Sequence, residues 1–131
     1  MTSPSQGTLP ITAKLFLISG AVSACASVVF SAAFAHLPVF SAGVPAMVQT
    51  ALTQQQFHAL GLVAVGLSIV RLGASRWLLC AGWLMLAGLF LFSFNLYARY
   101  VFGMDTFKAA VPWGGGAWIL AWLAFSYAPS A

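Results

Sequence analysis

The chain has 131 residues, of which 62% are hydrophobic, and its charged residues are five Lys/Arg and a single acidic residue, Asp105. A soluble domain carries roughly 25% charged residues, so this composition excludes a water-soluble globule and indicates a membrane protein. The net charge of +4 comes from single basic residues near the ends of apolar segments, as in membrane-interface anchors. It forms no basic patch of the kind that binds nucleic acid.

Four apolar segments are each long enough to cross a bilayer, since a spanning helix needs about 20 residues. The predicted fold class is an all-α membrane protein, a four-transmembrane-helix bundle with a short interfacial helix between its first two helices. Residues 13–128 form a single domain, and residues 1–12 form a polar tail that is too short to fold alone. The spans are expected at 13–37, 52–70, 77–100 and 109–127.

The first predicted span carries a stripe of serines at every fourth position. The stripe consists of Ser19, Ser23, Ser27 and Ser31. Small residues on one face let helices in a membrane approach closely, and serine hydroxyls hydrogen-bond within or between helices. The stripe therefore predicts that this helix packs at the centre of the bundle.

The second apolar run, at 57–70, is only about 21 Å long at helical rise, which is short of a hydrocarbon core of about 30 Å. The span must therefore borrow the preceding turns from around Leu52. We expect one continuous helix from Ala46 to Val70 whose first turns form the interfacial helix. In the fourth span, the glycines of Trp113-Gly114-Gly115-Gly116 are expected to let the start of the helix pack closely on a neighbour.

An even number of spans places both termini on one side of the membrane, together with the short link at 71–76. That side carries three basic residues, Lys14, Arg71 and Arg76, and the other side carries two, Arg99 and Lys108. Basic residues are enriched in cytoplasmic loops. The predicted location is the bacterial inner membrane, with both termini in the cytoplasm.

Polar side chains inside the spans are the candidates for function, because they are costly in hydrocarbon. The residues that stand out are His36, His58, Asn95, Tyr97 and Arg99, and the predicted topology puts them all in one half of the membrane. Asn95 and Arg99 are four residues apart and so share a helix face. We predict a polar cluster at the non-cytoplasmic interface, in which Arg99 is a lipid-interface anchor.

The two histidines of this cluster allow two interpretations. Imidazoles on neighbouring helices can hold haem iron or copper, so a haem or quinone site at His36 and His58 is one hypothesis. The other is that both rings hydrogen-bond across helices and settle loop geometry. No thiolate or carboxylate joins the two histidines at metal-ligand spacing, so no metal site is predicted.

No catalytic machinery is recognisable in the spans. They contain no Asp or Glu, which proton relays typically use and which a hydrolytic triad uses to orient its histidine. Asp105 lies in a loop. We therefore expect that the protein is not an enzyme and is not a drug–proton antiporter.

Four segments follow one another in an order and spacing that cover nearly the whole chain after Thr12. They are Ser19-Gly20 with Ala32-Ala33-Phe34-Ala35-His36, then Gln56-Phe57-His58-Ala59-Leu60, then Ala81-Gly82-Trp83 through Leu91-Phe92-Ser93 and Leu96-Tyr97, and last Pro112-Trp113-Gly114-Gly115 through Ala121-Trp122. Together they resemble the YgdD-like family of small inner-membrane proteins, domain of unknown function family 423. Alanine and serine replace the glycines that this family usually carries before His36. The resemblance implies a four-helix membrane fold and no particular activity, cofactor or catalytic residue.

The primary functional hypothesis is a small non-catalytic accessory or structural subunit in contact with membrane lipids. Its expected partner is a larger membrane-protein complex or further copies of the same chain. Two alternatives remain open. One is an electron-transfer or quinone-site subunit that uses His36 and His58, and the other is a transporter or conduit for small solutes, lined by the serine stripe.

Overall fold

The computed structural model describes residues 8–130, and every regular element in that part of the chain is a helix. The α-helices are α1 Ile11–His36, α2 Ala46–Leu72, α3 Arg76–Gly88, α4 Asn95–Phe102 and α5 Val111–Tyr127. A π-helical segment at Leu89–Phe94, called the π segment below, joins α3 to α4. Short 3-10 turns lie at Pro38–Phe40, Lys108–Ala110 and Ala128–Ser130. The predicted all-α class is confirmed.

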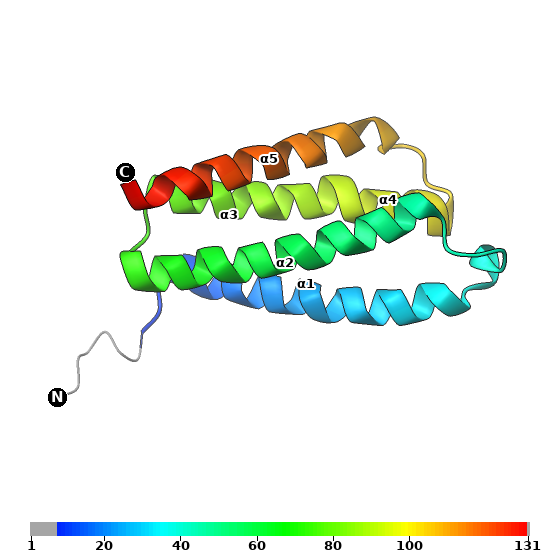
Figure 1. Cartoon of the computed structure of the whole chain (residues 1–131), viewed down its shortest axis with the longest axis horizontal. Coiled ribbons are helices and arrows are strands. Elements are labelled where there is room, and N and C mark those ends of the chain that lie inside the picture. Colours follow the sequence, from blue (N-terminus) through cyan, green and yellow to red (C-terminus); the bar gives the residue numbers. More distant parts are fainter. Residues whose placement is uncertain (1–7, 131) are drawn as a thin grey trace.

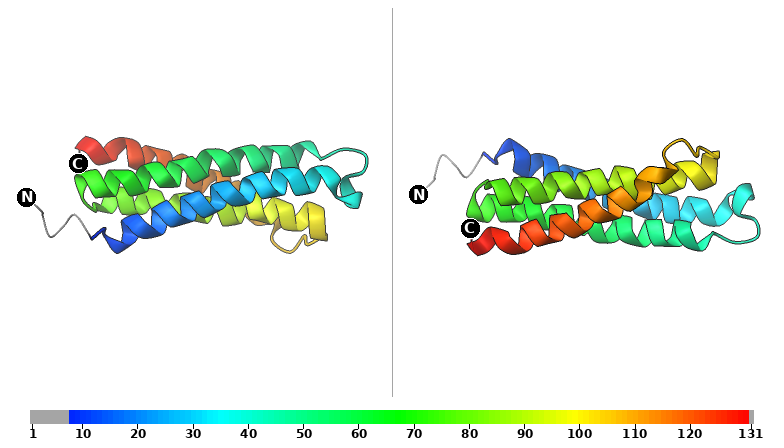
Figure 2. Two further views of the ribbon diagram at one scale, coloured as in Figure 1. Left: turned by 90° about the horizontal axis from the view of Figure 1, so that it is seen from below. Right: turned by 90° about the horizontal axis from the view of Figure 1, so that it is seen from above.

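Four stretches of helix are long and apolar enough to cross a membrane, as predicted. They are Ile11–His36, Ala46–Leu72, Arg76–Phe102 and Lys108–Ser130. The start of α1, the end of α5 and the link between α2 and α3 lie at one end of the bundle (Figure 1). The two loops that follow α1 and α4 lie at the other end (Figure 2). The arrangement agrees with both termini lying on one side of a membrane, whereas the identity of that side stays a prediction.

Helix α2 is unbroken from Ala46, and its first turns are in line with the rest of the helix. Within residues 8–130 there is therefore no separate interfacial helix between the first two spans, because the first turns of α2 pack in the bundle as part of the spanning helix. Between α1 and α2 the structure adds only the single 3-10 turn at Pro38–Phe40. With 27 residues, α2 is about 40 Å long, which exceeds a hydrocarbon core of about 30 Å. It ends at Gly73, whose φ of 86° is unfavourable for residues with a side chain.

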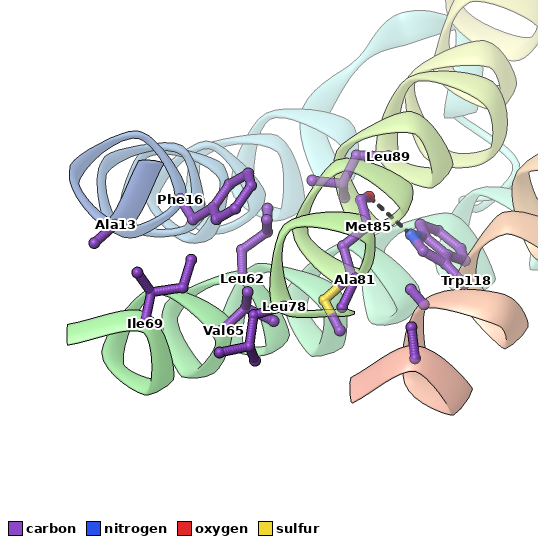
Figure 3. Packing of buried hydrophobic residues seen from close by; sticks show 12 residues of the cluster. Ala13, Phe16, Leu62, Val65, Ile69, Leu78, Ala81, Met85, Leu89 and Trp118 are labelled. Atoms are coloured by element: carbon purple, nitrogen blue, oxygen red, sulfur yellow. Dashed lines mark hydrogen bonds between the residues drawn. The ribbon is translucent and has the colours of Figure 1, made fainter. Parts of the chain in front are cut away.

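Buried side chains form two clusters that together draw on every spanning helix. The larger cluster comprises Ala13, Phe16, Leu62, Val65, Ile69, Leu78, Ala81, Met85, Leu89, Trp118, Ala121 and Ala124 (Figure 3). The second comprises Phe34, Phe40, Val48, Ala51, Leu52, Leu96 and Tyr97. Trp118 Nε1 donates a hydrogen bond of 3.1 Å to the Met85 carbonyl, which ties α5 to α3.

Glycines bring helix backbones closest together at Gly20 and Gly114. A Cβ added to Gly20 would lie 2.7 Å from the Ala59 carbonyl oxygen, so α1 touches the backbone of α2 there. A Cβ added to Gly114 would lie 2.7 Å from the Phe92 backbone nitrogen, so α5 touches the π segment. The predicted close packing at the start of the fourth span is thus seen at Gly114. Close approach of this kind is a main source of helix association in lipid.

The serine stripe faces the bundle interior over only half its length. Ser23 and Ser27 are buried, Ser19 is half-buried and Ser31 is exposed. A spacing of four residues advances about 40° per step around a helix with 3.6 residues per turn. The stripe therefore rotates out of the interface as it approaches the end of α1.

Candidate functional site

The structure places the five sequence-predicted site residues at separate positions rather than in one cluster. His36 is exposed at the end of α1, and His58 is buried between α2 and α5. Tyr97 is buried against α2, whereas Asn95 and Arg99 face the loop after α4. His58 lies about 18 Å further along the bundle than the start of α2. His36 is the last residue of α1, and the end of α1 lies near the start of α2 (Figure 1). The two histidines are therefore not positioned around one iron or copper ion.

His58 is enclosed by the aromatic residues of α5. Its ring stacks on Trp118 with centroids 3.9 Å apart and planes at 8°. His58 Nδ1 lies 2.8 Å from the Gln54 carbonyl oxygen, which can only accept, so Nδ1 carries the proton. Nε2 then accepts from Trp122 Nε1 at 3.0 Å. Both ring nitrogens are thus occupied, Nδ1 within α2 and Nε2 in the bond that holds α2 to α5, and ligation of a metal at Nε2 would require breaking the bond to Trp122.

A groove of about 350 Å³ opens beside His58 on the outer face of α2 and α5. We call it the α2–α5 groove. It is lined by Thr50, Gln54, Phe57, His58, Phe92, Gly115, Trp118, Ile119 and Trp122. Two of its polar groups, the Thr50 hydroxyl and the Gln54 side-chain amide, hydrogen-bond to no other residue within 8–130. The groove thus combines an aromatic wall with unpaired hydrogen-bonding groups.

A second polar centre lies on the other side of α2, at Gln55, which sequence reasoning did not single out. The Gln55 side chain is fully buried. Its Nε2 donates to the Ser23 carbonyl at 2.9 Å, and its Oε1 accepts from the Tyr97 hydroxyl at 2.6 Å. One amide therefore connects α1, α2 and α4. Beside it, Ser93 Oγ donates 2.8 Å to the Ala51 carbonyl.

The spacing of residues along α2 carries a signal that could have revealed Gln55. Val48, Gln55, Leu62 and Ile69 follow one another at intervals of seven residues, and all four are buried. A seven-residue repeat keeps side chains on one helix face. An amide within such an apolar row predicts a buried polar contact between helices, because a polar group in hydrocarbon needs a partner.

Asn95 and Arg99 hold the loop after α4 against the helix. The Asn95 backbone N–H bonds to the Phe92 carbonyl, three residues earlier. The Asn95 side chain then donates to the Leu91 carbonyl at 3.0 Å and to the Phe107 carbonyl at 2.6 Å. Arg99 forms an exposed ion pair of 3.4 Å with Asp105. Asn95 therefore both satisfies a carbonyl of the π segment and docks the loop.

The described part of the chain contains no cluster of metal-binding side chains. No group of three or more His, Cys, Asp or Glu residues among positions 8–130 is arranged to hold a metal ion. What the polar side chains do form is a set of bonds between helices, through Gln55, His58 and Asn95.

Fold and polar interior together define an integral membrane protein with four membrane-spanning helices. The chain belongs to the DUF423 family, a family of proteins of unknown function, whose pattern matches residues 31–115. The family resemblance inferred from the sequence is thereby confirmed.

Relatives of this chain are membrane proteins from several bacteria. The UPF0382 membrane protein YwdK of Bacillus subtilis is 34% identical over 120 residues, covering 84% of this chain and 91% of the relative. A UPF0382 membrane protein of Staphylococcus saprophyticus is 34% identical over 112 residues, covering 84% and 92%. One from Haemophilus influenzae is 31% identical over 80 residues, covering 61% and 63%. No solved structure matches the chain.

Proposed function

We propose that this membrane protein is a non-catalytic accessory or structural subunit that associates laterally with other membrane proteins. The observation that carries the proposal is the outer face of α2 and α5. There the bundle leaves hydrogen-bonding groups unpaired at Thr50 and Gln54, and it leaves open space over Gly115. A protein partner in the membrane would satisfy both features.

The two open glycines support a contact outside the bundle. In a helix, glycine is less favourable than alanine by about 1 kcal/mol, and its benefit in a membrane is close approach of a neighbouring helix. Gly114 has such a neighbour in the π segment, whereas a Cβ on Gly115 or Gly116 would meet nothing within 4 Å. Gly115 and Gly116 would allow the close approach of a helix from another protein, as Gly114 allows the close approach of the π segment inside the bundle.

The two alternative functions receive less support from the contacts. An electron-transfer or quinone role at His36 and His58 would need ring nitrogens that are free and near each other, whereas those of His58 are bonded to Gln54 and Trp122. A solute conduit along the serine stripe would need hydroxyls that face a passage. Ser27 Oγ instead donates 2.6 Å to the Ala24 carbonyl of its own helix.

Purification in a mild detergent tests the proposed association. We expect the tagged protein to migrate on native gels as an assembly larger than the 13.8 kDa chain with its micelle. Replacing Gly115 by Leu, which fills the open face, should reduce that assembly, because the partner helix can no longer approach. The matched control is Leu67→Phe, at a lipid-facing position of α2 that is 56% exposed. A lone monomer under the mildest extraction would contradict the proposal.

The bacterial inner membrane, with both termini in the cytoplasm, is part of the same proposal. The excess of Lys14, Arg71 and Arg76 over Arg99 and Lys108 supports it. A green fluorescent protein fused to the C-terminus should therefore fluoresce in bacterial cells, and an alkaline phosphatase fusion at the same point should be inactive. The matched control is an insertion of either reporter in the loop at 103–107, where the two signals should reverse. An active phosphatase at the C-terminus would refute this orientation.

A further inference from the structure

We propose that the occupant of the α2–α5 groove is a second copy of this chain, related to the first by a two-fold axis along the membrane normal. The inference rests on the proposed lateral association and names its partner. The depth of Gln54, the chemistry of its amide and the open surface of α5 support it.

Gln54 lies deep within the bilayer. Its neighbour Gln55 donates a hydrogen bond to the carbonyl of Ser23, which lies midway along the 26 residues of α1. Ser23 is therefore about 18 Å from either end of its helix. Since the hydrocarbon core is about 30 Å thick, Gln55 lies near its centre, and Gln54 differs from it by one residue of helical rise, about 1.5 Å.

An unpaired amide at this depth is unfavourable. Water is scarce in the hydrocarbon core, and a polar group without a partner there costs several kcal/mol. Within residues 8–130 no donor or acceptor reaches the Gln54 side chain, which lines the groove together with Thr50. Gln56, two residues along the helix, is exposed, whereas Gln54 is half-buried in the groove. A molecule seated in the groove that offers both donors and acceptors at this depth would satisfy the Gln54 amide.

A second copy meets this requirement by symmetry. Every copy inserts with the same topology, so the Gln54 side chains of two neighbouring chains lie at the same depth. A two-fold axis along the membrane normal brings identical surfaces together. Because a carboxamide has both a carbonyl acceptor and NH₂ donors, two Gln54 side chains related by this axis can form two reciprocal hydrogen bonds.

The surface of α5 allows the approach that this pairing needs. Gly115 lines the same groove as Gln54, and nothing lies within 4 Å of a Cβ built on it. A neighbouring helix can therefore come as close at Gly115 as the π segment comes at Gly114. Open glycine surface and an unpaired amide are independent features, and both lie in one groove.

The amide contact is tested by two substitutions on one helix. Gln54→Leu should raise the dimer dissociation constant about 10-fold, measured by energy transfer between labelled chains in liposomes at a series of protein-to-lipid ratios. Gln56→Leu is the control, because Gln56 is exposed and lies about 200° around the helix from Gln54. Equal dissociation constants for the Gln54→Leu variant and the parent would overturn the proposal.

Cross-linking in native membranes tests the geometry and separates this inference from the proposed function. With the two exposed cysteines, Cys25 and Cys80, replaced by Ala, Gly115→Cys should give a disulfide-linked dimer of this chain on oxidation. Val22→Cys is the control and should stay monomeric. Val22 is 61% exposed on α1, at the depth of Ser23.

The outcomes of this cross-linking distinguish two failures. A Gly115→Cys product that contains a different membrane protein and no homodimer would overturn the second-copy inference and leave the proposed lateral association in place. A Gly115→Cys variant that forms no product with any protein, while energy transfer shows no dimer, would overturn both.

Discussion

Gly114→Ala should destabilise the bundle by about 2–3 kcal/mol, because the added methyl group would overlap backbone. Its Cβ would lie 2.7 Å from the Phe92 nitrogen and 2.9 Å from the Leu91 carbonyl carbon. Backbone atoms of a helix cannot rotate away as a side chain can, so α5 must move as a whole. That movement would loosen the stack of Trp118 on His58. Reversible unfolding in mixed micelles of a mild detergent and dodecyl sulfate measures the effect.

The adjacent residue provides the matched control. A Cβ on Gly115 would meet nothing within 4 Å, so Gly115→Ala should leave the unfolding free energy of the monomer unchanged or raise it by up to about 1 kcal/mol, through better helix propensity. The two variants make the same chemical change one residue apart. Equal losses for both would contradict the backbone contact between α5 and the π segment.

Gln55→Leu should destabilise the bundle by about 1–3 kcal/mol, and Tyr97→Phe should partly rescue it. Leucine removes the acceptor of the Tyr97 hydroxyl, which then remains unpaired in a buried position. Removing that hydroxyl as well eliminates the unpaired group. The double variant should therefore be more stable than Gln55→Leu alone, by about 1 kcal/mol.

The same unfolding assay on the two single variants and the double variant completes a double-mutant cycle. Both Gln55→Leu and the double variant also lose the hydrogen bond to Ser23. Because that loss is common to the two, their difference reports only the Tyr97 hydroxyl. Additive losses, with no rescue, would contradict the hydrogen bond between Gln55 and Tyr97.

In this thin bundle, a few hydrogen bonds between helices fix how the helices are arranged. Gln55 joins α1, α2 and α4, and His58 joins α2 to α5 through Trp118 and Trp122. Such bonds are directional, whereas contacts among aliphatic side chains in lipid discriminate poorly between helix registers. The remaining polar groups, on the α2–α5 groove, are left for a partner.

The number, type and order of the helices could be predicted from the sequence because each is a local property. A run of about 20 apolar residues is a spanning helix whatever its neighbours are. The short apolar run at 57–70 also predicted correctly that the second helix continues back to Ala46. The π segment at Leu89–Phe94 was not predicted, and the contacts that accompany it, with Gly114 of another helix and between Asn95 and Phe107, join residues that are distant in sequence.

The candidate site was predicted less well. His58 and Tyr97 were identified as polar residues within spans, but their partners, Trp122 and Gln55, come from positions 64 and 42 residues away. Their grouping with His36, Asn95 and Arg99 rested on depth alone. Depth follows from position along each helix, whereas the direction of each side chain around the helix depends on how the helices pack.

The sequence by itself determined that the chain lies in a membrane, that it crosses four times and which family it resembles, because hydrophobicity and helix length act residue by residue along the chain. Only the tertiary structure decided which polar groups pair inside the bundle and which remain unpaired on its surface. The reason is that a hydrogen bond between helices requires two atoms within about 3 Å, and residues distant in sequence reach that separation only when the helix rotations and crossings are in place.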